Sequence, residues 1–278
     1  MRHYWLLVLL AIFSDCVWAQ EPPDRAGESF HITVFHESKS EEETGSSSSS
    51  GRHEYIERIV AIRNEGVERV FDITRQPDEK SQLIDWQFPV RIFEANDGKM
   101  EIVNRGDMEA RRDAWLEAAE IPFEACGTWY FTWNAFQVEC DPEAILETVR
   151  RINIQPENLE DGASFSHPAA IRPGSLQKLN DVGSEFRVRM VVDEEHFHRS
   201  AAQNDVIVGE IMGEPITFDE AYERRTVEQI TGTIEVILTV SESGRVAKQV
   251  TSIETTKIKI DGKEERSVSN EVIERTET

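Results

Sequence analysis

The chain has 278 residues and a formal net charge of −23 at neutral pH, and 39% of its residues are hydrophobic. This apolar content can form a substantial core, and the length suits one large domain or two smaller ones. So negative a charge argues against DNA, RNA and anionic lipid surfaces as partners, because all three would repel the chain.

The first residues have the pattern of a secretory signal peptide. A short basic start precedes the apolar run 5–13, which is too short to span a bilayer. Residues 17–19 have the small-residue spacing of a signal-peptidase site, so we expect a signal peptide over 1–19 and cleavage between Ala19 and Gln20. A membrane anchor or a buried helix is the alternative interpretation of this segment.

The mature chain is expected to be exported, and periplasmic or secreted. Cys16 follows Asp15, whereas lipoprotein signals carry a small residue there, so we do not expect lipid attachment. No later stretch is apolar over the length that a membrane-spanning helix needs.

Residues 20–52 are assigned to an N-terminal strand followed by a linker. Phe30, Ile32 and Val34 alternate with polar residues, and this period of two predicts a strand. The charged and serine-rich segment 39–51 has no apolar residue to bury, so we expect it to be flexible.

An N-terminal α+β lobe is predicted over 53–160, and it begins with two hairpins. Asn64-Glu65-Gly66 and Asn96-Asp97-Gly98 each separate two apolar-rich runs, and such turns are strong hairpin signals. Residues 76–86, with Pro77 in the first turn, are expected to form a short helix between them.

A second helix is expected over 106–120. Asp107 is placed as its N-cap, and Met108, Trp115 and Ala119 fall on one face.

Cys126 and Cys140 are the cysteines left after signal cleavage, and two cysteines in an exported chain predict a disulfide. Zinc binding and a catalytic thiol are less favoured, since no CxxC or Cys/His cluster is present. Trp129, Phe131 and Trp133 lie between the two cysteines and share one face of a strand. They are interpreted as a core wall, or alternatively as an aromatic ligand-binding surface.

The second cysteine leads directly into a predicted helix. Asp141 has the role of an N-cap, Pro142 takes the first helical position, and Glu143 lies at the positive end of the helix dipole. Four apolar residues then follow at helical spacing: Ile145, Leu146, Val149 and Ile152.

Residues 161–183 are rich in turn-forming residues and are predicted to be a loop or lobe boundary. The β-rich lobe 184–278 follows. It is expected to begin with a strand over 185–192, a short helix capped by Asp193, and a further strand over 206–213.

A capping box of Thr217 and Glu220 then opens another short helix. The final segment predicts a three-stranded meander with turns near 241–244 and at Asp261-Gly262. One face of its first strand is apolar: Ile230, Ile234, Val236, Leu238 and Val240.

His196 and His198 form the one close histidine pair, which could hold a metal on a strand. A helix capped by Asp193 would point them apart, which disfavours the metal.

Ser175 and Lys178 match a short SxxK pattern, which we interpret as coincidence because the accompanying KTG element is absent. The chain has no nucleophile elbow, phosphate-binding loop or dinucleotide fingerprint, and we expect no cofactor.

The sequence therefore predicts an α+β fold, with a mostly antiparallel curved sheet of hairpins and a C-terminal meander, covered on one face by amphipathic helices. We expect a non-catalytic envelope protein that binds or carries an apolar ligand or binds a protein partner. The alternatives are an exported hydrolase that uses dispersed acidic and histidine residues, and a purely structural envelope protein.

Overall fold

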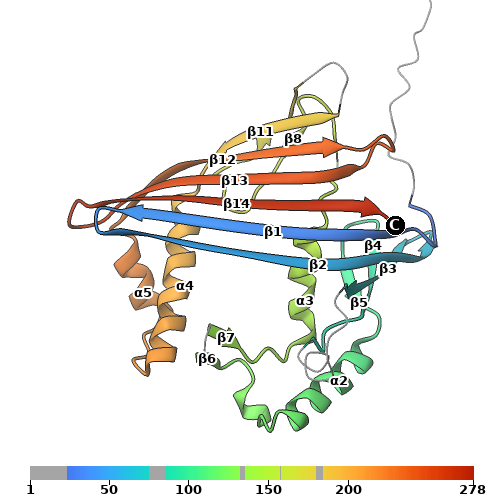
Figure 1. The fold of residues 1–278 in the computed structure, drawn as a ribbon, viewed down its shortest axis with the longest axis horizontal. Helices are drawn as coiled ribbons and strands as arrows, with labels where there is room; N and C mark the ends of the chain where they lie inside the picture. The colour runs from blue at the N-terminus through green and yellow to red at the C-terminus, as the bar shows by residue number, and fades with distance from the viewer. Residues whose placement is uncertain (1–23, 75–84, 132–134, 157, 180–183) are drawn as a thin grey trace, which may run out of the picture.

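Ten antiparallel strands form one sheet in the computed structural model, which describes residues 24–278 except 75–84, 132–134, 157 and 180–183. In spatial order the strands are β10-β11-β12-β13-β14-β1-β2-β3-β4-β5. Figure 1 shows the helices on one side of this sheet. The prediction of an α+β fold with a mostly antiparallel sheet is confirmed.

The centre of the sheet is the hairpin of β1 (Ser29–Glu42) and β2 (Gly45–Arg63). Phe30, Ile32 and Val34 are buried on its helix-facing side, as their alternation predicted. β14 pairs with the other side of β1, so the two ends of the described chain lie in neighbouring strands.

The serine-rich segment is part of β2, and its prediction as a flexible linker was wrong. The pairing of β1 with β2 continues without a break to Glu42 and Gly45. The apolar half of the hairpin sets the register. The backbone hydrogen bonds between the strands then continue through the serine segment, although its side chains are exposed. A hydrogen bond of 2.8 Å between the Ser38 and Ser49 hydroxyls adds a cross-strand contact.

Two further hairpins extend the sheet from β2. β3 (Gly66–Ile73), β4 (Val90–Ala95) and β5 (Met100–Ile102) follow in spatial order. The predicted turns at 64–66 and 96–98 are both present, and Gly98 has a φ of +80°, which favours glycine. The helix predicted over 76–86 falls largely outside the described residues.

The predicted C-terminal meander is confirmed as β12 (Gln229–Val240), β13 (Val246–Ile258) and β14 (Glu264–Glu277). β11 (Glu185–Val191) and β10 (Gln177–Lys178) complete this side of the sheet. Strands from both predicted lobes thus belong to one sheet, and the division into lobes stays a prediction.

Helix α2 (Arg105–Ala118) begins one residue earlier than predicted, and Asn104, not Asp107, is its N-cap residue. The Asn104 side chain accepts a hydrogen bond of 2.8 Å from the backbone N–H of Arg91 on β4, so it ties the helix to the sheet. Asp107 lies in the first turn, where its charge suits the helix dipole.

The predicted helix after Cys140 is confirmed. Asp141 caps a single 3₁₀ turn, η2 (Pro142–Ala144), by accepting a hydrogen bond of 3.0 Å from the backbone N–H of Glu143. This turn continues into α3 (Ile145–Ile152). The four apolar residues predicted for its inner face are all buried: Ile145, Leu146, Val149 and Ile152.

Helix α4 (Glu194–Met212) corrects two predictions. Asp193 is its N-cap as expected, but the helix is long, and residues 206–213 belong to it and its C-cap instead of forming a strand. The helix ends at Gly213, which has a φ of +73°. Helix α5 (Phe218–Arg225) packs against α4 and opens with the predicted capping box of Thr217 and Glu220.

Smaller elements complete the fold: η1 (Phe123–Ala125), the hairpin of β6 (Trp129–Phe131) and β7 (Ala135–Gln137), and the pair β8 (Ser164–Phe165) and β9 (Gly174–Ser175). The main core lies between the sheet and α3. Within the described ranges, none of the helices has the length and apolar composition that a membrane crossing requires.

Candidate functional site

A cavity of about 870 Å³ lies between the helix-facing side of the sheet and α3. Part of its lining is apolar, and these residues come from five separate elements. They include Ile32 of β1, Val67 and Phe71 of β3, Ile92 of β4, Met100 of β5, and Val149 and Ile152 of α3. Because α3 turns its apolar face toward the sheet, the cavity has apolar walls on both sides.

Much of the polar lining belongs to a network of arginines and carboxylates. Arg69 on β3 is its centre and contacts Asp24 at 2.6 Å, Glu57 at 3.1 Å, and Glu94. All four side chains are largely buried, so these ion pairs are less screened by solvent than surface pairs.

Arg245, in the turn before β13, extends the network to the start of the described chain. Its guanidinium contacts Asp24 at 3.2 Å and Glu28 at 2.9 Å. Burial acts to raise the pKa of Glu28, but hydrogen bonds from Arg245 and from the backbone N–H of Arg25 outweigh it, so this pKa lies below its ordinary value.

Arg275, near the end of β14, differs from the other two arginines. Only 9% of its side chain is exposed, and its Nε donates a hydrogen bond of 2.9 Å to Glu57. Its guanidinium carbon lies 3.3 Å from the centre of the Phe30 ring. Its two Nη groups donate to no residue that the structure describes, so they are available to a ligand in the cavity.

The network carries slightly more negative than positive charge. Arg69, Arg245 and Arg275 supply three positive charges, and four carboxylates supply four negative ones: Asp24, Glu28, Glu57 and Glu94. A bare anion would therefore meet a local net charge of −1 in addition to the overall charge of the chain.

A second cavity, of about 470 Å³, lies between α4 and α5. Arg225 donates two hydrogen bonds, of 2.6 and 2.7 Å, to the carboxylate of Asp205. These bonds raise the pKa of Arg225. Arg225 also contacts one carboxylate oxygen of Glu228 at 3.1 Å. The other oxygen is buried without a hydrogen-bond partner among the described residues.

The predicted disulfide between Cys126 and Cys140 is present, with the two Cα atoms 5.5 Å apart. It packs in a small cluster with Leu116 and Val138, separate from the main core. The bond therefore fixes the segment between α2 and α3.

Among the described aromatic side chains between the cysteines, Trp129, Tyr130 and Phe136 line neither cavity described above. Trp129 is half-buried in β6, and its backbone N–H donates to Glu210 of α4 at 3.2 Å. Phe131 ends β6, and Trp133 lies outside the described residues. Their role in ligand binding remains a prediction, as does the cleavage site at Ala19 and Gln20, which also lies outside the described residues.

His196 and His198 lie on α4, as the cap at Asp193 predicted, and they make separate contacts. His198 is buried with its Nε2 at 3.0 Å from the backbone oxygen of Glu228, whereas the His196 ring packs edge-on against Phe197.

Burial, together with nearby His196, lowers the pKa of His167. The described part of the chain contains no group of three or more side chains that could hold a metal ion.

Sequence reasoning missed the arginine network, although part of its signal was visible. Arg69 has the strand parity of Val67 and Phe71, and Arg275 has that of buried Ile273. An arginine on the apolar face of a strand must find partners in the interior. The partners themselves are distant in sequence: Arg275 and Glu57 are 218 residues apart.

No family model matches this chain, and no curated protein matches it either. Among solved structures, it is similar to lipovitellin, with 8% identity and a TM-score of 0.43 over 91% of this chain and 25% of that one. It thus spans about a quarter of the lipovitellin chain.

Two bacterial proteins are also similar over 91% of this chain. Ail, the attachment invasion locus protein of Yersinia pestis, has 5% identity and a TM-score of 0.20, with its whole chain covered. A DUF1329 family protein from Desulfovibrio piger has 7% identity and a TM-score of 0.15, with 85% of its chain covered. At these TM-scores none of the three likenesses identifies a function, so the site is interpreted from its own geometry.

Proposed function

We propose that this protein is a non-catalytic binding protein or carrier for a small amphiphile, which it holds in the cavity between the sheet and α3. The observation that carries the proposal is the position of Arg275. A buried arginine with two uncommitted Nη groups lines a cavity that also has apolar side chains on both the sheet and α3.

The apolar walls suit the chain of an amphiphile. A volume of about 870 Å³ falls within the range of about 300–1,000 Å³ that is usual for small-molecule sites. Side chains such as Phe71, Met100 and Ile152 would remove the ligand's apolar surface from water, which is the main favourable contribution to binding.

The polar wall suits the head group. Arg275 can donate two parallel hydrogen bonds to a phosphate or carboxylate, which is the geometry that guanidinium groups favour. Because the network has a net charge of −1, a zwitterionic head is favoured over a bare anion: its acceptor would meet Arg275, and its cation would lie near Glu94 or Asp97.

The disulfide supports an oxidising compartment, since such bonds persist mainly in exported proteins. Together with the signal-peptide pattern of the first 19 residues, it favours a periplasmic or secreted location.

The rival hypothesis of a hydrolase has less support. The histidine pair proposed for its site does not converge, because His198 faces the backbone of Glu228 and His196 packs on Phe197. The described carboxylates at the main cavity include Asp24, Glu57 and Glu94, and these are paired with arginines.

A matched pair of tryptophan variants tests the proposal. Val67 lines the cavity on β3, whereas Val60 is 43% exposed on β2 and does not line it. We expect Val67→Trp to fill part of the cavity and to weaken binding of a fluorescent lysophosphatidylcholine by roughly tenfold or more. Val60→Trp should bind as the wild type does.

The probe is titrated below its micelle concentration, with circular dichroism to check that both variants are folded. Equal binding by the two variants would place the ligand elsewhere, and no binding by the wild type would reject the amphiphile.

A further inference from the structure

The outer edge of β2 is exposed over the first part of the strand, from Gly45 to Arg52. β3 pairs with β2 only from Tyr55 to Arg63, whereas β1 pairs with β2 along the whole strand. From Gly45 to Arg52 no described strand lies on the outer side, and all but Gly51 of these residues are exposed.

The backbone of this edge is ready to pair. In an antiparallel sheet, successive residues direct their N–H and C=O groups to alternate sides of the strand. The N–H and C=O of Ile59 face the β1 side, where they bond to Glu28 and Gly27, and the C=O of Glu54 faces outward to Thr74. By this alternation Ser46, Ser48 and Ser50 direct their backbone groups outward.

Devices that usually protect an exposed edge are missing here. Such edges commonly carry lysine, proline or a bulge that prevents pairing with another chain. The segment from Gly45 to Gly51 contains only glycine and serine, and its register with β1 is regular. It is also uncharged, although the chain as a whole carries a net charge of −23.

We infer that this edge pairs with the same edge of a second copy of the chain, in antiparallel orientation and centred on Ser48. The sequence Gly-Ser-Ser-Ser-Ser-Ser-Gly from 45 to 51 reads identically in both directions about Ser48. A two-fold axis there places each glycine opposite a glycine and makes the contact self-complementary.

The charges at the two ends of the segment select the antiparallel orientation. The acidic tip, residues 41–43, precedes the segment, and Arg52 follows it. Antiparallel pairing places Arg52 of one copy near the acidic tip of the other, whereas parallel pairing would align like charges. Since each copy carries a large negative charge, added salt should strengthen the dimer by screening the general repulsion.

The test compares Ser48→Pro with Ser48→Ala by sedimentation velocity across a concentration series. Proline lacks a backbone N–H, so Ser48→Pro removes a donor that faces the second copy and keeps every donor to β1. Because Ser48 lies on the two-fold axis, the variant loses two hydrogen bonds between the copies of each dimer. We expect it to raise the dissociation constant of the dimer roughly tenfold or more. Ser48→Ala keeps the backbone donor and should leave the dimer unchanged.

A cross-linking experiment keeps the inference falsifiable if the proline variant fails to fold. Ser48→Cys lies on the proposed axis and should form a disulfide-linked dimer under mild oxidation, whereas Lys39→Cys on β1, away from this edge, should not. A wild type that is monomeric at all concentrations, together with a Ser48→Cys variant that forms no cross-linked dimer, would overturn the inference. So would a dimer that survives Ser48→Pro unchanged. None of these outcomes depends on whether the cavity binds an amphiphile.

Discussion

At the scale of single residues, the cavity depends on arginines whose partners come from remote parts of the chain. Arg245 joins Glu28 across 217 residues, and Arg275 joins Glu57 across 218. Strand parity identifies an inward-facing arginine from sequence alone, but it does not identify the carboxylate that will face it. The apolar side of the cavity was more predictable, because Ile32, Val149 and Ile152 follow simple periods.

Glu28 provides a pH test of the network. Its folded-state pKa lies below the ordinary value of 4.5, so its stabilising effect is fully present above that pH and is lost as the pH falls through the folded-state value. We expect Glu28→Gln to be less stable than the wild type at neutral pH by about 1–2 kcal/mol, since a charge-assisted hydrogen bond to Arg245 is lost.

The measurement is urea unfolding of both proteins at several pH values. The difference between them should shrink below pH 4.5, and Glu65→Gln, in the exposed turn after β2, serves as the control. A difference that stays constant down to acid pH would contradict this account of Glu28.

At the scale of elements, the strands and caps were predictable where a local signal was strong. Hairpin turns, the caps at Asp193 and Thr217, and the inner face of α3 all follow from short-range chemistry. Two errors, the flexible segment over 39–51 and the strand over 206–213, have one cause, which is that the structural context outweighed the local composition. The β-branched run Val206, Ile207 and Val208 favours a strand by composition. In the structure this run lies inside α4, which continues to its C-cap at Gly213.

The disulfide permits a prediction about local stability. Because Cys126 and Cys140 pack in a small cluster apart from the main core, the double variant Cys126→Ser with Cys140→Ser should loosen residues between α2 and α3 and leave the sheet folded. In the chain-entropy model, removing a disulfide that closes a loop of this size lowers the free energy of unfolding by about 3 kcal/mol.

Hydrogen exchange distinguishes the outcomes. Amides near Val138 should exchange faster in the double variant, while those of β12 and β13 should keep their protection. Equal loss of protection in both regions would show that the disulfide supports the whole fold.

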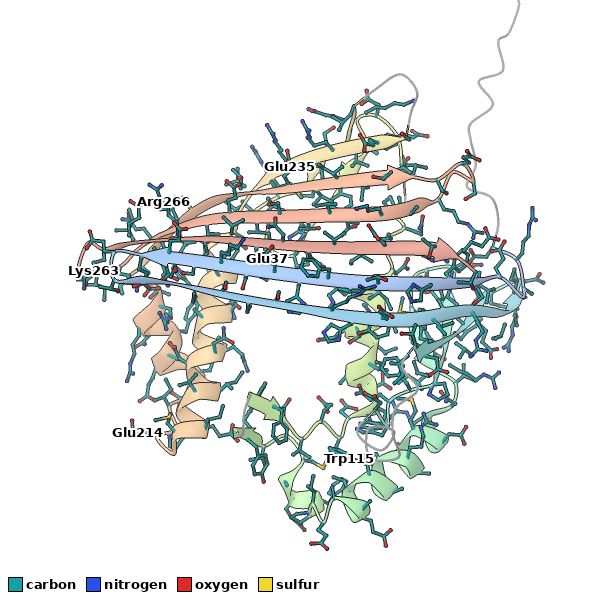
Figure 2. The ribbon with its side chains drawn as sticks, viewed as in Figure 1. Glu37, Trp115, Glu214, Glu235, Lys263 and Arg266 are labelled. Carbon is teal, nitrogen blue, oxygen red and sulfur yellow. A yellow bond between two sulfur atoms is a disulfide. The ribbon has the colours of Figure 1, made fainter. Side chains whose placement is uncertain are left out.

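At the scale of the whole molecule, strands from the N-terminal, central and C-terminal parts of the described chain belong to one sheet. β14 lies against β1, and the hairpin of β1 and β2 connects the C-terminal meander to β3, β4 and β5 (Figure 1). Figure 2 shows Glu37, Glu235 and Arg266 along the sheet and Trp115 and Glu214 at the helices beneath it. This layout leaves one face of the sheet to solvent and places the cavity on the other, between β-strands and α3.

Strand order was the part of the fold that sequence could not provide. Each hairpin is local, but the pairing of β1 with β14 depends on residues more than 200 positions apart, as the hydrogen bond between Ser40 and Glu265 illustrates. This pairing contributes part of the cavity's polar lining, since it brings Arg275 beside Glu57 and Phe30.

A crystal structure of the protein soaked with a lysophosphatidylcholine tests the central claim most directly. We predict one ligand between the sheet and α3, with its chain against Phe71 and Ile152 and its phosphate within hydrogen-bond distance of the Nη groups of Arg275. A cavity that stays empty while the ligand binds elsewhere, or a head group that points away from Arg275, would contradict the account.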